Sequence, residues 1–245
     1  MRTNQPYKVR AYRDLTTNNS LHYFNVLVEE SDLLVGSDSI LSDDAYNILY
    51  KYRSYINDYI CLYPSFKELL VPAVTDHHAP AIVQSMIASS QICGVGPMAS
   101  VAGAISEYVG LDLRQYSRNV IIENGGDIFC DTVFDVTVSV YAGTSPLSNR
   151  LSLIVKSQNT PCGICTSSGT IGHSRSFGRA DAVCVIAPSS SLADAAATAI
   201  ANRITDAASI TKTISFGQSI PGLSGILIIV GNSMGVWGSI ELAEQ

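Results

Sequence analysis

Glu123-Asn124-Gly125-Gly126-Asp127-Ile128 is the stretch from which the fold can be inferred. Residues 119–129 are interpreted as a strand that runs into a turn, because two adjacent glycines let the backbone adopt positive φ. The alternating residues 133–141 are expected to be its partner strand. The turn would present the Asp127 carboxylate at its rim. The alternative is an ordinary tight turn with a solvated Asp127, since Asn and Asp are common turn residues.

The segments around this turn form blocks of strand and helix patterns. Residues 7–35 are interpreted as a hairpin that turns at residues 17–20. Helices are expected over residues 42–59, 79–93, 98–109 and 190–204, and strands over residues 150–156, 181–187, 226–230 and 236–242. Strand patterns and helix patterns come in blocks rather than in strict alternation, which favours an α+β fold over a doubly wound parallel sheet. We expect mixed or antiparallel sheets packed with helices in a single compact domain over residues 1–245.

The composition excludes several classes of partner. The 245 residues are 47% hydrophobic and 15% charged, with a net charge of −6. Nucleic acid and anionic membrane surfaces need a basic face that this chain lacks. The N-terminal residues do not resemble a signal peptide, so a cytoplasmic location is expected. The apolar composition and exposed hairpins favour a homodimer.

A second group of polar residues lies in the Gly/Ser/Thr-rich residues 160–179, which are expected to form a functional loop. Thr166, Ser167, Ser168 and Gly169 supply exposed backbone N–H groups and hydroxyls there. These groups could hold a phosphate group of a ligand. A polar surface loop is the plain alternative. Ser167 or Ser168 with His173 and an Asp would also suit a cofactor-free hydrolase, although the G-x-S-x-G pattern is absent.

A third group is the pair Asp194 and Thr198 within an Ala-rich helix. Residues four apart lie on one face of a helix, so both oxygens point to one place. Oxygen ligands of this kind suit magnesium or calcium. The alternative is that Asp194 lies in the first turn of the helix and interacts with its dipole.

Two other sets of metal-type residues give weaker signals. Cys162 and Cys165 form one C-x-x-C pair, which without a second pair is a poor zinc motif. Asp76-His77-His78 lies between Pro72 and Pro80 and is interpreted as a structural loop.

Together the three polar groups resemble the signatures of ApbE proteins. Asn124-Gly125-Gly126-Asp127 resembles their Gly-Gly-Asp motif, and Thr166-Ser167-Ser168-Gly169 their Thr-Ser-Gly loop, with His173 near their active-site histidine. Residues 193–198 resemble their Ala-Asp…Thr helix. The whole chain is more similar to a short, uncharacterised protein family within that superfamily, chiefly over residues 94–110, 166–182 and 237–242.

The resemblance implies an ApbE-like, T-fold-related structure. ApbE proteins are flavin transferases that bind FAD and magnesium and attach FMN to a Thr or Ser of a partner protein. Carried over by position, Asp194 and Thr198 would bind magnesium, and Asp127 and His173 would take part in the chemistry. The ligand would be held by Asn124, Gly125, Gly126, Thr166, Ser167, Ser168, Gly169 and Arg175.

This sequence differs from the flavin transferases in one segment that bears on its expected function. Residues 174–178 stand where the transferases have an Ile/Val-x-Asp-Pro stretch. We therefore expect a pocket for a small anionic ligand similar to a flavin nucleotide, without the standard FMN transfer. Relatives in this family are associated with sulfur assimilation, which implies an accessory role beside an acceptor or pathway protein. The alternative is a magnesium-dependent enzyme that processes FAD.

Overall fold

The computed structural model describes residues 20–168 and 178–244, and one antiparallel sheet runs through them. Its eight strands follow the order β1-β2-β3-β4-β7-β8-β9-β10. They are β1 (His22–Val28), β2 (Ser31–Ser37), β3 (Val120–Asn124), β4 (Asp127–Asp131), β7 (Cys162–Ser167), β8 (Ala182–Ala187), β9 (Gly225–Val230) and β10 (Ser233–Gly238). A three-stranded sheet comprises β11 (Glu241–Glu244), β6 (Leu151–Val155) and β5 (Val136–Ser139).

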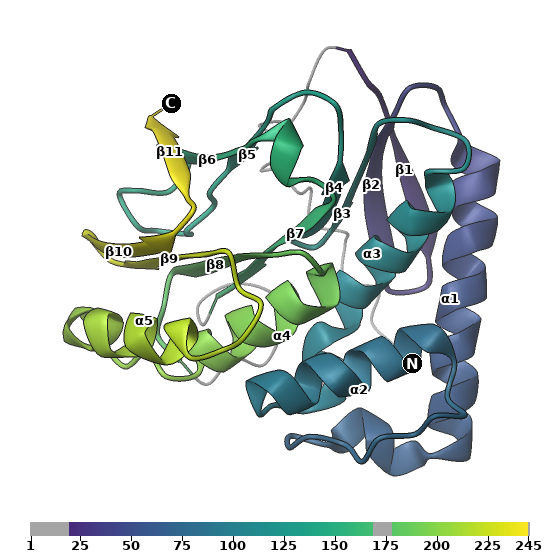
Figure 1. Ribbon diagram of the computed structural model, residues 1–245, viewed down its shortest axis with the longest axis horizontal. Helices are drawn as coiled ribbons and strands as arrows, with labels where there is room; N and C mark the ends of the chain where they lie inside the picture. Colours follow the sequence, from purple (N-terminus) through teal and green to yellow (C-terminus); the bar gives the residue numbers. More distant parts are fainter. Residues whose placement is uncertain (1–19, 169–177, 245) are drawn as a thin grey trace, which may run out of the picture.

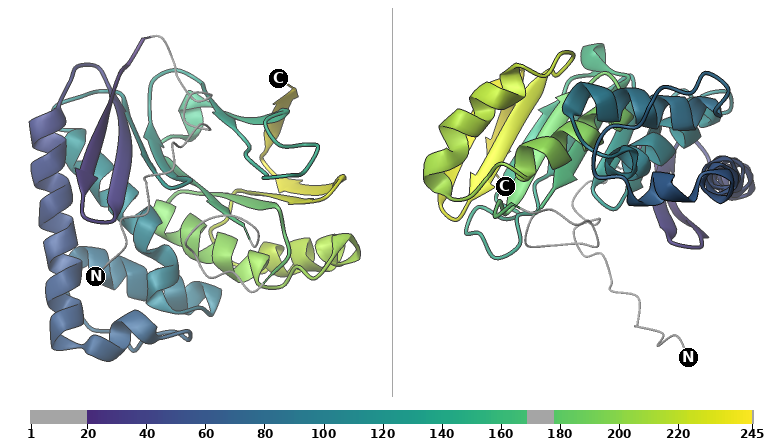
Figure 2. Two further views of the ribbon diagram at one scale, coloured as in Figure 1. Left: turned by 180° about the vertical axis from the view of Figure 1, so that it is seen from behind. Right: turned by 90° about the horizontal axis from the view of Figure 1, so that it is seen from below.

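The helices lie along one face of the large sheet, and the small sheet packs on the other (Figures 1 and 2). The α-helices are α1 (Ser42–Leu62), α2 (Ala81–Cys93), α3 (Val101–Leu113), α4 (Ser190–Ala201) and α5 (Ile210–Gln218). Short 3₁₀ helices span Pro64–Glu68, Pro97–Ser100, Ser157–Asn159 and Ala207–Ser209. Apolar residues of both sheets meet in a separate core that includes Ile128, Leu153 and Leu227.

The helical face contains two cores that meet in the middle of the sheet. The first joins α1, α2 and α3 to strands β1 to β4 and includes Leu33, Met86 and Phe129. The second joins α4 and α5 to β7, β8 and β9 and includes Ile200 and Ile226. Helix α3 packs on β3 and β4, whereas α4 packs on β7 and β8. The contact between α3 and α4 therefore lies above the neighbouring strands β4 and β7, which we call the β4–β7 junction.

The α+β prediction is confirmed, but two strand assignments are wrong. The described part of the expected N-terminal hairpin is β1–β2, which turns at Glu29 and Glu30; the predicted arm at residues 7–16 and residues 17–19 of the predicted turn lie outside the described part of the chain. Residues 119–129 form two strands, β3 and β4, because the glycine turn reverses the chain between them. Consequently Val136–Ser139 is not the partner of β3 but pairs with β6 in the small sheet.

The predicted functional loop over residues 160–179 begins with a central strand instead. Cys162–Ser167 is β7, paired with both β4 and β8. Its small residues reflect the close approach of α4, since a Cβ on Gly163 would lie 2.3 Å from Ser190 Cα. The predicted strands at β6 and β8, the β9–β10 hairpin and the helix at α4 are confirmed. The single strand expected over residues 236–242 is instead the end of β10 and the start of β11 in the other sheet, and α5 was not predicted.

Candidate functional site

The turn between β3 and β4 is built as its glycines suggest. Gly125 and Gly126 have φ values of 71° and 104°, which other residues rarely adopt. Glu123 Oε1 accepts a hydrogen bond from the Gly126 N–H at 2.8 Å and closes the turn. Asn124 Nδ2 donates to the carbonyl oxygen of Ala102 at 3.1 Å. The turn is thereby tied to the start of α3.

Asp127 follows this turn and is buried, with only 8% of its surface exposed. It lies on β4 directly opposite Cys165 of β7, beneath the helices. Burial raises the pKa of Asp127 well above its ordinary value, and the negative charges of Asp194 and then Glu123 raise it further. The alternative of a solvated turn aspartate is therefore wrong.

Asp194 reaches the β4–β7 junction from α4. Its Oδ2 accepts a hydrogen bond from the Gly103 N–H at 2.9 Å. Burial raises the pKa of Asp194 to about 7, even though the N–H groups of Gly103 and Ala102 act to lower it. Because α4 begins at Ser190, Asp194 is beyond its first turn, and the proposed interaction with its own helix dipole is wrong. Asp194 instead stabilises the first turn of α3, whose N–H groups have no partner within that helix.

The carboxylates of Asp127 and Asp194 therefore lie near each other. Within residues 20–168 and 178–244, no Lys, Arg or His forms an ion pair with Asp127 or Asp194. Thr198 lies one turn beyond Asp194 on α4 and is buried. No cluster of three or more His, Cys, Asp and Glu side chains in those residues could hold a metal ion. The donors present are two carboxylates and a hydroxyl.

Ser167 supplies an unsatisfied hydroxyl on the same side of the sheet. Side chains alternate along a strand, so Ser167 shares the helical face with Cys165. Ser167 is 6% exposed, and its Oγ has no hydrogen-bond partner in the described structure. Such an orphaned buried hydroxyl is unfavourable unless a ligand satisfies it. Thr166, by contrast, points to the other face, where its Oγ1 donates to Cys184 Sγ at 3.2 Å.

Of the remaining predicted ligand residues, some lie in the described part of the chain and others lie outside it. Gly125 and Gly126 form the turn beside the junction, and Ser168 is half-buried at the end of β7. Gly169, His173 and Arg175 lie outside the described residues. The structure thus brings together Asn124, Asp127, Ser167 and Asp194 around the junction.

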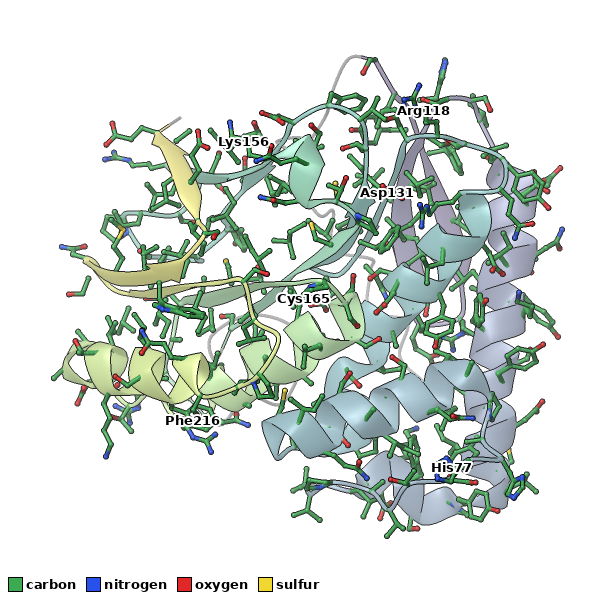
Figure 3. The ribbon with its side chains drawn as sticks, in the orientation of Figure 1. His77, Arg118, Asp131, Lys156, Cys165 and Phe216 are labelled. Atoms are coloured by element: carbon green, nitrogen blue, oxygen red, sulfur yellow. The ribbon has the colours of Figure 1, made fainter. Side chains whose placement is uncertain are left out.

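Cys165 lies under α4 at the centre of the molecule (Figure 3). Burial raises the pKa of its thiol well above the ordinary value, and the charges of Asp127 and Asp194 raise it further. The thiol therefore stays protonated and donates to the Ser190 carbonyl oxygen at 3.3 Å. Cys162 is three positions away on the same strand and faces the small sheet. The C-x-x-C pair is thus split between two faces and does not form a zinc site.

Asp76-His77-His78 forms a structural loop, as predicted. Asp76 accepts hydrogen bonds from the His78 N–H at 2.9 Å and the Tyr59 hydroxyl at 3.1 Å. A hollow of about 420 Å³ beside this loop is lined in part by His77 and Tyr108, and His77 is far from Cys165 in Figure 3. Neither this hollow nor a second of about 200 Å³ beside Cys162 is lined by a predicted site residue.

In the described part of the chain, no single helix is long and apolar enough to span a membrane. Only Ala81–Cys93 and Pro97–Leu113 taken together reach that length and composition, and they are bent by 105° to each other.

The architecture is that of the flavin transferases. The chain is similar to the flavin transferase ApbE from Vibrio cholerae, with a TM-score of 0.57 and 12% identity over 89% of this chain and 97% of that one. It is equally similar to the apo form of the flavinyl transferase ApbE of Pseudomonas stutzeri, with a TM-score of 0.57 over 89% and 94% of the two chains. At 12% identity these likenesses establish the fold.

The family follows from the sequence comparisons. The family model described as "AbpE bacteria" matches residues 13–216. The UPF0280 protein of Methanococcus aeolicus is 41% identical over 210 residues, covering 82% of this chain and 85% of that protein. The UPF0280 protein of Methanocaldococcus jannaschii is 38% identical over 221 residues, covering 88% and 90%. The chain belongs to this ApbE-like UPF0280 family.

Proposed function

We propose that the protein binds the magnesium complex of a pyrophosphate-bearing nucleotide of the flavin type at the β4–β7 junction. The observation that supports this most directly is the approach of Asp127 and Asp194, neither of which is paired with a Lys, Arg or His of residues 20–168 and 178–244. Two neighbouring buried carboxylates repel each other and disfavour ionisation. A bound divalent cation removes that cost and lets both ionise.

The donor set fits magnesium. Mg²⁺ prefers oxygen ligands and is commonly held by one or two carboxylates together with phosphate oxygens of a substrate. Asp194 and Thr198 would hold it from α4, and Asp127 from β4. When bound, magnesium would neutralise pyrophosphate charge and polarise its bridging bond. The protonated thiol of Cys165 donates to the Ser190 carbonyl oxygen and is a neutral neighbour of the carboxylates rather than a magnesium ligand.

The chain also offers groups for the anionic part of the nucleotide. Ser167 Oγ is buried and lacks a partner in the described structure, so a phosphate oxygen would satisfy it. The carboxylate of Glu123 fixes the Gly125-Gly126 turn beside the junction. Gly169 and Arg175, which follow Ser167 in sequence, are further candidates for contacts to this anion.

A second candidate function is FMN transfer, which the likeness to flavin transferases favours. FAD would be cleaved at its pyrophosphate, with FMN passing to a Thr or Ser hydroxyl of an acceptor protein and AMP leaving. By the family resemblance, His173 and Asp127 would then take part in the proton transfers. Binding without release of AMP supports the first function, and magnesium-dependent release of AMP supports the second.

The test is calorimetric titration of FAD with and without magnesium. We expect binding that requires magnesium and is lost in Asp194→Ala. Thr198→Ser, which keeps the hydroxyl, should bind nearly as well as the wild type, whereas the isosteric Thr198→Val should bind at least several-fold more weakly. If FAD binds equally well without magnesium or in Asp194→Ala, the ligand does not occupy this junction.

A further inference from the structure

We propose that Glu107 is the positioning residue of this site, which holds α4 so that Asp194 reaches the β4–β7 junction. The inference rests on the proposed cation site and concerns how this chain assembles it. Glu107 is in the second turn of α3 and is absent from the candidate residues identified in the sequence. Its carboxylate contacts the start of α4 rather than the ligand site itself.

One oxygen of Glu107 gathers three hydrogen bonds from the first residues of α4. Oε2 accepts from the Ser191 N–H at 2.9 Å, from Ser191 Oγ at 2.9 Å and from Ser189 Oγ at 2.8 Å. Ser189 Oγ in turn accepts from the Leu192 N–H at 3.3 Å and caps the helix. The carboxylate of Glu107 therefore neutralises the positive end of α4 and fixes where that helix begins.

The same two helices are joined in the opposite direction by Asp194. Its carboxylate, on α4, accepts from the Gly103 N–H in the first turn of α3. Gly103 and Glu107 are four apart on α3, and Ser191 and Asp194 are three apart on α4, so each pair lies on one helix face. Each helix thus supplies the carboxylate that caps the other.

The two helices have little freedom to shift past each other at this contact. A Cβ on Gly103 would lie 2.3 Å from the Ser190 carbonyl oxygen and 2.7 Å from Asp194 Cβ. Ser85 Oγ of α2 also contacts Ser191 Oγ at 3.1 Å. Once Glu107 fixes Ser189 and Ser191, the position of Asp194 one turn later is fixed as well. Loss of Glu107 should therefore displace the carboxylate that would bind the cation.

The experiment compares the wild type with Glu107→Ala and Glu107→Gln, and has one measurement without metal and one with it. The first is backbone hydrogen exchange at the Gly103 amide in metal-free protein. The second is the affinity for Mn²⁺ alone, measured by electron paramagnetic resonance. We expect Glu107→Ala to speed exchange at Gly103 and to weaken Mn²⁺ binding by about tenfold or more, the usual effect of removing a group that orients a metal ligand. Glu107→Gln keeps an acceptor oxygen and should show smaller changes in both.

Asp38→Ala is the matched control, because Asp38 also gathers several hydrogen bonds but far from the junction. Its carboxylate accepts from the N–H groups of Arg118 and Asn119 at 2.8 and 3.1 Å and from Asn119 Nδ2 at 2.8 Å. The Asp38→Ala substitution should lower thermal stability. It should leave the Mn²⁺ affinity unchanged, and also the exchange rate of the Gly103 amide relative to other core amides.

The outcomes separate this inference from the proposed function. Unchanged exchange at Gly103 in Glu107→Ala overturns the positioning role, whatever the metal does. Equal loss of Mn²⁺ affinity in Asp38→Ala also overturns it, because the effect would then be general destabilisation. Faster exchange at Gly103 with no Mn²⁺ binding by the wild type supports the positioning of Asp194 but contradicts the cation site.

Discussion

Asp127 on β4 and Cys165 on β7 are register partners on neighbouring antiparallel strands, and burial and then the charge of Asp127 raise the pKa of the Cys165 thiol. Both side chains are buried, so a charge on either one disfavours a charge on the other. The pair is therefore neutral or singly charged in the absence of a cation. This relationship keeps the Cys165 thiol protonated, so that it donates to the Ser190 carbonyl oxygen and is not a nucleophile.

Native thiol labelling should accordingly be confined to one cysteine. Cys61 is exposed, whereas Cys93, Cys130, Cys162, Cys165 and Cys184 are buried. The thiolate is the reactive form of cysteine. Burial raises the pKa of Cys165 well above its ordinary value and raises the pKa of Cys93 to about 12, so both stay protonated. We expect iodoacetamide at pH 8 to add one group to the folded protein and six after denaturation, counted by mass spectrometry. Rapid labelling of Cys165 in the folded state would contradict this environment.

The stability of the metal-free protein should fall as pH rises through the titration of Asp194. The pKa of this carboxyl is about 7 in the folded protein against an ordinary value of 3.8, so the folded state holds the proton more tightly. The free energy of unfolding therefore decreases between about pH 4 and pH 7 and levels off above that range. Because one pKa unit corresponds to about 1.4 kcal/mol, a rise of the pKa from 3.8 to about 7 corresponds to a loss on the order of 4 kcal/mol.

Asp194→Asn is the variant that isolates this effect in urea denaturation at pH 5 and pH 8. It cannot ionise but can still accept the Gly103 hydrogen bond, so it should lose less stability at the higher pH than the wild type does. Magnesium should restore wild-type stability at pH 8 and leave the variant unchanged. An identical pH dependence in both proteins would show that Asp194 titrates normally.

Replacing the orphaned hydroxyl of Ser167 should have opposite effects on stability and on binding. Ser167→Ala removes a buried polar atom that has no partner in the described structure, so we expect the unliganded protein to gain about 1 kcal/mol. The same change should weaken FAD binding, because a phosphate contact is lost. Thermal unfolding and calorimetry on one preparation measure both effects.

Ser152→Ala provides the comparison for that variant. Ser152 Oγ is also buried without a partner in the described residues, but it lies on β6 in the small sheet. Its replacement should give a similar gain in stability and unchanged FAD affinity. If both variants weaken FAD binding alike, Ser167 has no direct contact with the ligand.

Gly103→Ala should be destabilising even though Ala favours helices by about 1 kcal/mol over Gly. The added Cβ would meet backbone at the Ser190 carbonyl oxygen, which cannot move without shifting α4. We expect a loss of about 2 kcal/mol, typical of overpacking. Gly217→Ala in α5 is the control, because its Cβ would meet the flexible ends of Ile226 and Ile200 and should cost less. Urea denaturation of both variants provides the measurement.

The sequence by itself determined the fold class, the glycine turn before Asp127 and the helix that carries Asp194 and Thr198. These are local properties, because a positive-φ turn and a helix face depend on residues within a few positions of each other. The family resemblance added the expectation that these segments converge. Periodicity failed at β7, where small residues predicted a loop, because the pattern does not reveal that α4 packs closely on Gly163.

Only the tertiary structure decided which of these groups share an environment. The burial of Asp127, its approach to Asp194 and its pairing with Cys165 depend on strands and a helix that are 38 to 67 positions apart in the sequence. The split of the C-x-x-C pair follows from strand pleating once β7 is central in the sheet. Glu107 gave no signal in the sequence, because a carboxylate that caps another helix has no characteristic spacing and acquires its partners only when α3 and α4 pack.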